Sequence, residues 1–128
     1  MGIYSVTKHA VVALSESLYH DLAKTEPRIK ASVLCPGFVP TGISSSSRNR
    51  PSELRNERPP TESEKRVAAS ISHAVESGRL SASDIATQTL DAVRSGRFYV
   101  FTHTELLPAL HSRCDDLRDL RAEPRQRA

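Results

Sequence analysis

Two residues near the start of the chain have the types and spacing of a proton-transfer pair. Tyr4 and Lys8 stand four positions apart in the stretch GIYSVTKH, and on a helix this spacing puts both side chains on one face. A free tyrosine titrates near 10, so supplying a phenolate at neutral pH requires about 4 kcal/mol of differential stabilisation. A nearby ammonium in a partly dry site supplies much of it, and the phenol can then exchange a proton with an alcohol or carbonyl. By itself, however, Y-x-x-x-K also occurs by chance in many helices.

The elements that must position this pair are a helix and a strand. Residues 4–23 are rich in helix formers, with apolar residues at helical spacing (Val11, Leu14, Leu18 and Leu22), which predicts a helix that expects neighbours on more than one side. Pro27 ends it. The run Ile29–Cys35 contains β-branched residues and stops at Pro36-Gly37, which predicts a buried strand.

The rest of the chain is predicted to add a loop, three helices and one strand. Proline and serine dominate residues 36–60, as is typical of a long loop. Capping patterns at 61–64 and 81–84 each predict a helix start, with helix ends at Gly78 and Gly96. The aromatic run Arg97–Thr102 predicts a strand, and a last amphipathic helix begins near Pro108.

This order of elements predicts an α/β fold. Strands joined by long helical crossovers pair in parallel, with helices on the faces of the sheet. Only two strands are predicted, whereas a parallel sheet normally has several. We therefore expect an incomplete sheet, the edge of a larger one.

Composition narrows the classes of function. The chain has 128 residues and a formal net charge of +3, with basic residues mixed among carboxylates rather than interleaved with aromatics, which argues against a nucleic-acid partner. No apolar stretch approaches membrane-spanning length and no secretion signal is visible, so we expect a cytoplasmic protein. Cys35 and Cys114 lack metal-ligand spacing, which predicts two reduced thiols. The five histidines form no ligand pattern, so no metal site is expected.

Two segments together resemble the short-chain dehydrogenase/reductase family. These are YSVTKHAVVALSESLYHDL and, some thirty residues after its start, ASVLCPGFVPT; the later SGRFYVFTH fits the family's last crossover and strand. The resemblance covers about the first hundred residues. It implies that residues 1–121 are the C-terminal part of an NAD(P)-binding, Rossmann-type doubly wound domain, with residues 38–60 as the substrate lid and residues 122–128 as a frayed tail.

The resemblance also implies a reaction and roles for particular residues. The reaction is hydride transfer between NAD or NADP and an alcohol or ketone substrate. Tyr4 would be the general acid/base, and Lys8 would stabilise its phenolate and hydrogen-bond the nicotinamide ribose. Four residues (Pro36, Gly37, Val39 and Thr41) would lie against the nicotinamide end of the cofactor. Homo-oligomers are expected for full-length members of the family.

Other parts of the family pattern are missing from this sequence. It contains no Gly-rich turn of the TGxxxGxG kind for the pyrophosphate. Only three residues precede Tyr4, so the family's upstream catalytic serine and asparagine are absent. Ser5 does not replace the serine, because an adjacent helix position points about 100° away. We therefore expect the C-terminal half of an oxidoreductase that is inactive alone. The alternative is a non-catalytic module that docks to a full-length relative.

Overall fold

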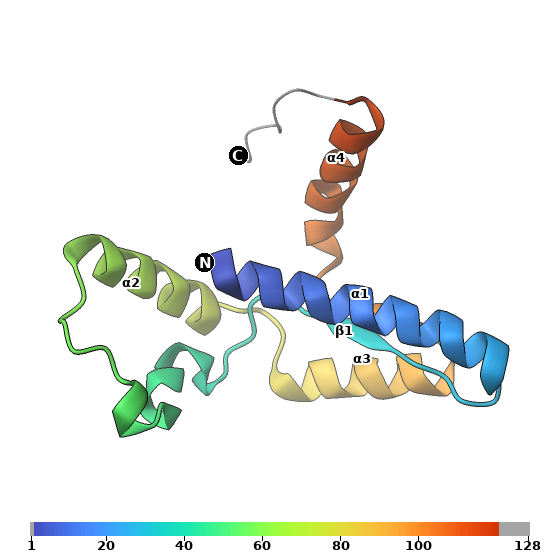
Figure 1. The fold of residues 1–128 in the computed structure, drawn as a ribbon, viewed down its shortest axis with the longest axis horizontal. Helices are drawn as coiled ribbons and strands as arrows, with labels where there is room; N and C mark the ends of the chain where they lie inside the picture. Colours follow the sequence, from blue (N-terminus) through green and yellow to red (C-terminus); the bar gives the residue numbers. More distant parts are fainter. Residues whose placement is uncertain (1, 121–128) are drawn as a thin grey trace.

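The computed structural model describes residues 2–120, which form a two-stranded parallel sheet with helices on both faces (Figure 1). The predicted α/β class is confirmed. In chain order the elements are α1 (Gly2–Thr25), β1 (Val33–Cys35), η1 (Gly42–Asn49), η2 (Ser52–Leu54), α2 (Glu62–Glu76), α3 (Ala82–Arg94), β2 (Tyr99–Phe101), η3 (Thr104–Leu106) and α4 (Leu107–Arg118), where η marks a 3₁₀ helix.

Both strands are shorter than the sequence predicted. The predicted strand Ile29–Cys35 narrows to Val33–Cys35, and Arg97–Thr102 narrows to Tyr99–Phe101. Each strand has a single neighbour among residues 2–120, and the ladder runs only from Val33 opposite Tyr99 to Cys35 opposite Phe101. The first helix, by contrast, is slightly longer than expected and ends two residues before Pro27. The predicted frayed tail, residues 122–128, lies outside the described residues.

Successive side chains of β2 point to opposite faces of the sheet, and their contacts show which helix covers each face. Tyr99 reaches Glu16 of α1, so the odd-numbered positions of this strand face α1. Val100 points the other way, toward α3, and is 2% exposed. Figure 1 shows α1 and α3 on opposite sides of β1. The apolar core is small, and its buried members are Val33, Val75, Ile85, Ala92 and Val100.

The helix boundaries that the capping patterns predicted are confirmed. Thr61 begins α2 with a reciprocal capping box to Glu64, and Ser81 begins α3 in the same way with Asp84. Arg58 also binds the Glu64 carboxylate with two nitrogens. This pair, with the Thr61 contacts, lowers the pKa of Glu64 to about 2. Gly96 ends α3 in the left-handed conformation at φ 66°.

Side chains rather than close backbone packing hold α1 to the rest of the molecule. The helix has no buried residue, and Leu14 of its apolar arc is 71% exposed. The Tyr99 hydroxyl donates a hydrogen bond to Glu16, and the Tyr19 ring lies 4.9 Å from that of Phe98, centroid to centroid. Most of the arc expected to meet neighbours on several sides is therefore left exposed by residues 2–120, and only Leu22 of its members is half-buried.

The Tyr99–Glu16 hydrogen bond makes the attachment of α1 sensitive to alkaline pH. The bond to Glu16, together with burial and the Glu16 charge, raises the pKa of Tyr99. A folded-state pKa above the unfolded one gives stability that is complete below about pH 10 and is lost as pH rises through the folded value. We expect Glu16→Gln to move the Tyr99 titration, followed by ring-carbon NMR, back toward the ordinary value. Glu26→Gln is the matched control, and an unchanged Tyr99 midpoint in Glu16→Gln would contradict this account.

Among the described residues no helix is both long enough and apolar enough to cross a membrane.

Candidate active site

Tyr4 and Lys8 contact each other on the first turns of α1, as their spacing predicted. The Lys8 ammonium nitrogen lies over the Tyr4 ring, 5.3 Å from its centroid. Tyr4 is 55% exposed, so the residue is not enclosed by the rest of the described chain. The Thr7 hydroxyl donates to the Tyr4 carbonyl at 2.8 Å, a bond within the helix that leaves both functional side chains free of it.

The first turns of α1 point toward the carboxyl edge of the sheet. Along β2, Phe98 contacts Tyr19 and the next residue, Tyr99, contacts Glu16, so the helix runs antiparallel to the strand. Beyond the strand, Arg113 of α4 lies 2.8 Å from the His9 ring, which is about two turns closer to the start of α1 than Glu16. In open α/β sheets this carboxyl edge is where ligands bind.

The predicted cofactor turn, residues 36–41, leaves β1 at this same edge. Its Gly37 N–H donates a 3.0 Å hydrogen bond to Nδ1 of His103, directly after β2. The approach is close: a Cβ on Gly37 would lie 2.9 Å from Cγ of His103 and 3.1 Å from a methyl group of Leu106. Only glycine therefore fits here without displacing the buried His103 ring and the Leu106 side chain.

Gly78, just after α2, packs against the other end of the turn. A Cβ at Gly78 would lie 2.6 Å from the carbonyl oxygen of Phe38 and 2.9 Å from Cδ of Pro40. The turn is thus held between the end of β2 and the end of α2. Between the described residues, no hydrogen bond joins this turn to Tyr4 or Lys8, so the structure brings the two groups to one edge without linking them.

Comparison with known proteins agrees with this arrangement. A family model described as short chain dehydrogenase matches residues 1–52. The crystal structure of a short-chain dehydrogenase/reductase from Burkholderia phymatum, in complex with NAD, superimposes on the whole chain with a TM-score of 0.95 and 44% identity. The CLA biosynthesis dehydrogenase/reductase of Lactiplantibacillus plantarum is 28% identical over 116 residues, 88% of this chain.

These three matches support the short-chain dehydrogenase/reductase family for this chain. The chain spans less than half the length of these two relatives, 40% of the Lactiplantibacillus plantarum protein and 45% of the Burkholderia phymatum chain. The family resemblance drawn from the Tyr-Lys helix and the Pro-Gly turn is confirmed.

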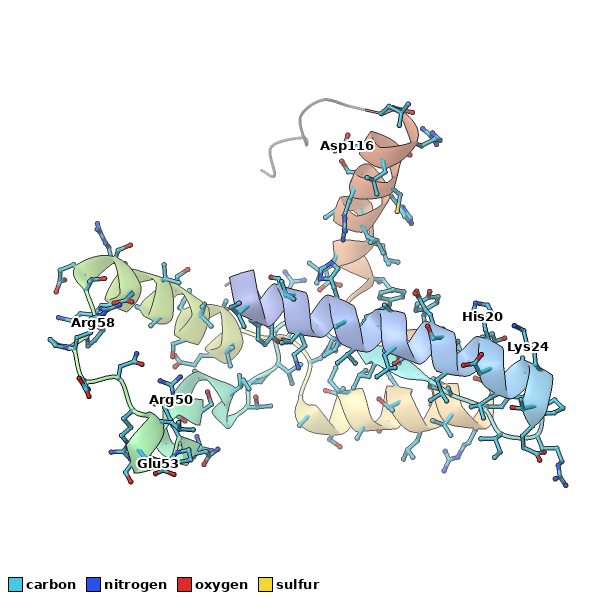
Figure 2. All side chains as sticks on the ribbon, viewed as in Figure 1. His20, Lys24, Arg50, Glu53, Arg58 and Asp116 are labelled. Carbon is cyan, nitrogen blue, oxygen red and sulfur yellow. The ribbon has the colours of Figure 1, made fainter. Side chains whose placement is uncertain are left out.

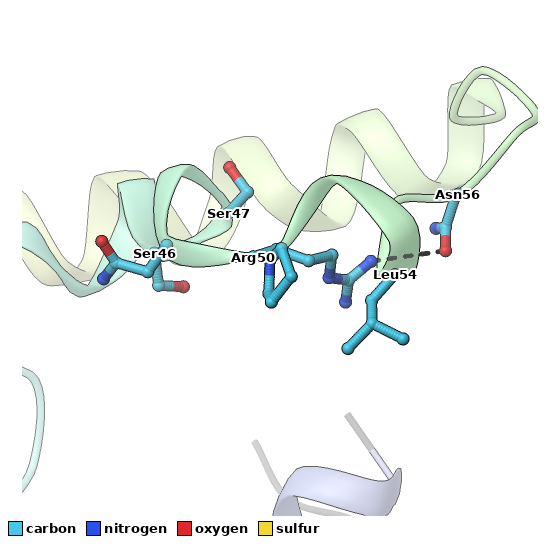
Figure 3. Close-up of a pocket in the computed structure, with 7 residues that line it drawn as sticks. Ser46, Ser47, Arg50, Leu54 and Asn56 are labelled. Atoms are coloured by element: carbon cyan, nitrogen blue, oxygen red, sulfur yellow. Dashed lines mark hydrogen bonds between the residues drawn. The ribbon is translucent and has the colours of Figure 1, made fainter.

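The segment predicted as the substrate lid is a loop with two 3₁₀ helices, η1 and η2. Every residue from Thr41 to Ser70 is exposed. A shallow cavity of about 630 Å³ opens between η1 and η2, lined by Ser46, Ser47, Asn49, Arg50, Pro51, Leu54 and Asn56. Figure 3 shows Arg50 bonded across it to Asn56, at 3.3 Å. It is a polar surface hollow within residues 46–56, and its lining does not include the turn that contains Gly37 and contacts Gly78.

Two arginines of this segment, Arg48 and Arg58, bind groups within the loop or next to it. Arg48 donates to the carbonyls of Gly42 and Ser45, and Arg58 pairs with Glu64 at the start of α2 (Figure 2). Both side chains are exposed. Their charges therefore brace the loop in this conformation.

Histidine and cysteine side chains form no metal-binding cluster in the part of the chain that the structure describes. No group of three or more His, Cys, Asp or Glu residues is placed to hold a metal ion there. His20 and Lys24 point away from the sheet on the outer side of α1 (Figure 2). Burial raises the pKa of the Cys35 thiol, which lowers its nucleophilicity.

Sequence reasoning missed two residues of this edge, His103 and Gly78. In the sequence His103 is one of five histidines without a ligand pattern, and Gly78 indicates only the end of a helix. A usable signal was the position of His103 directly after a strand predicted to pair with β1, since parallel strands end at a common edge. No pattern in the sequence indicated that Gly78 would meet Phe38 and Pro40.

Proposed function

We propose that this chain supplies the proton-transfer part of an NAD(P)-dependent oxidoreductase that interconverts an alcohol and a ketone. The observation that carries the proposal is the contact between Tyr4 and Lys8 on a helix whose first turns face the same sheet edge as the glycine-clamped turn. In alcohol oxidation the Tyr4 phenolate oxygen takes the hydroxyl proton, and in ketone reduction the phenol returns it. Lys8 stabilises the phenolate by its charge.

The residues present fit the nicotinamide end of NAD or NADP. When bound, the cofactor accepts or supplies the hydride. Lys8 has free donors for a ribose hydroxyl, and the turn offers backbone groups and the Thr41 hydroxyl. Pro36, Gly37 and Val39 would line the nicotinamide side, and the close packing of Gly37 and Gly78 keeps this backbone in one conformation. The sequence carries no Gly-rich turn for the pyrophosphate, so the chain by itself would lack most of the cofactor cradle.

Cofactor titration tests whether the chain holds only the nicotinamide end of the cofactor site. We expect residues 1–128 alone to show no saturable binding of NADH or NADPH below millimolar concentration, followed by nicotinamide fluorescence. In a chimera, residues 1–128 replace the matching 45% of the Burkholderia phymatum protein, and we expect this chimera to bind NAD at micromolar concentration. Micromolar binding by the chain alone would show that it is self-sufficient, whereas a folded chimera without NAD binding would overturn the proposed function.

The second candidate function is a non-catalytic interaction module. The exposed apolar arc of α1, including Ile3 at 81% and Leu14 at 71% exposure, favours it. Size-exclusion chromatography of the chain mixed with the full-length Burkholderia phymatum protein separates the two candidates. A mixed complex supports docking, and separate elution with an NAD-binding chimera supports the catalytic assignment.

A further inference from the structure

His103 is a buried side chain with no role in the proton transfer described above. It is 7% exposed and lies between the end of β2 and η3. Its Nδ1 atom lies 3.0 Å from the Gly37 nitrogen and 2.9 Å from the Thr102 hydroxyl oxygen. The ring therefore joins the end of one strand to the turn that follows the other.

The hydrogen bonds determine which nitrogen of His103 carries the proton. The Gly37 N–H is always a donor, so Nδ1 must present its lone pair. A proton on Nδ1 would face the Gly37 proton directly and break the contact. We therefore assign the neutral tautomer with the proton on Nε2, which has no hydrogen-bond partner among residues 2–120.

This bonding pattern indicates what the histidine contributes. Of its two ring nitrogens, only Nδ1 has a partner within the described chain, while the buried Nε2–H is left unsatisfied, which is unfavourable. A leucine of similar size would avoid that unsatisfied donor. The contacts of Nδ1 with the Gly37 N–H and the Thr102 hydroxyl are therefore what an apolar side chain cannot replace, and of these only the Gly37 bond reaches the turn after β1.

We propose that His103 is a positioning residue that holds the Pro36–Thr41 turn through the bond from Gly37 to Nδ1, and so orients the turn's backbone toward the nicotinamide. The proposal rests on the proposed function. It draws support from the packing of the turn, which His103 and Leu106 contact at Gly37 and Gly78 contacts at Phe38 and Pro40. With both ends held, the peptide groups between them have one orientation to offer a ligand.

The first test is direct detection of the bond in the ¹⁵N-labelled full chain. We expect a scalar coupling across the hydrogen bond between the Gly37 amide nitrogen and His103 Nδ1, and ring shifts of the neutral tautomer protonated at Nε2. A ring protonated at Nδ1, or a Gly37 amide without this coupling, would overturn the proposal. Because this measurement needs no variant, it holds even if a substitution unfolds the chain.

Two variants separate the acceptor from the bulk of the ring. His103→Asn places an amide oxygen near the position of Nδ1, and His103→Leu keeps volume without any acceptor. We expect Gly37 amide exchange to accelerate roughly five- to tenfold in His103→Leu and to stay near the wild-type rate in His103→Asn. Equal protection of Gly37 in the leucine variant would mean that packing alone holds the turn.

Millimolar NAD added to the same samples tests the role toward the cofactor. We expect amide shifts at Gly37–Thr41 in the wild type and in His103→Asn, and their loss in His103→Leu. Shifts that persist in His103→Leu would refute positioning by Nδ1. If the coupling is present but NAD moves no turn resonance even in the wild type and in the chimera, the proposed function fails, and the cofactor role of His103 is overturned with it.

Discussion

Replacing Tyr4 with phenylalanine in the chimera with the Burkholderia phymatum protein is expected to slow alcohol oxidation by about 10²–10⁴-fold. The substitution removes only the hydroxyl oxygen that exchanges the proton. The ring remains under the Lys8 ammonium, so the contact at 5.3 Å and the fold around it are retained. NAD reduction with a panel of alcohols, followed by absorbance, measures the loss, and calorimetric NAD binding should change little.

Tyr19→Phe is the matched control for this experiment. Tyr19 lies on the same helix and packs its ring against Phe98, so removal of its hydroxyl leaves the ring contact in place. We expect full activity in this variant. Undiminished activity of Tyr4→Phe beside an active Tyr19→Phe control would remove Tyr4 from the reaction.

Gly78→Ala is expected to destabilise the chain by about 1–3 kcal/mol, the range typical of overpacking at a tight site. The new methyl group would lie 2.6 Å from the carbonyl oxygen of Phe38, a backbone atom that moves only if the whole turn moves. Gly37→Ala meets side-chain atoms of His103 and Leu106 at 2.9–3.1 Å instead. We therefore expect a smaller loss there. Urea unfolding followed by circular dichroism measures both.

Gly2→Ala is the control for the two glycine variants. A Cβ at Gly2 would meet nothing within 4 Å, and alanine favours the helix that begins at this residue. We expect its stability to equal or slightly exceed that of the wild type. If Gly78→Ala matches Gly2→Ala in stability, the turn is not held from the α2 side.

Local sequence signals were sufficient to predict most helix boundaries. The reciprocal caps at Thr61 and Ser81 and the left-handed Gly96 depend on residues within a few positions of one another. Strand lengths were less predictable, because a strand extends only as far as its neighbour pairs with it. Each observed strand therefore contains only three residues of the longer predicted run, namely Val33–Cys35 and Tyr99–Phe101.

The sequence by itself determined the Tyr4–Lys8 pair, the Pro36-Gly37 turn and the family that both indicate. Those features rest on spacing along the chain, which a helix turn or a strand end converts directly into proximity. Only the tertiary structure decided that His103 accepts a hydrogen bond from Gly37, a residue 66 positions earlier in the chain. It also decided that Gly78 packs against the Phe38 carbonyl. Contacts of this kind depend on how the strand crossovers pack, and no local pattern encodes that packing.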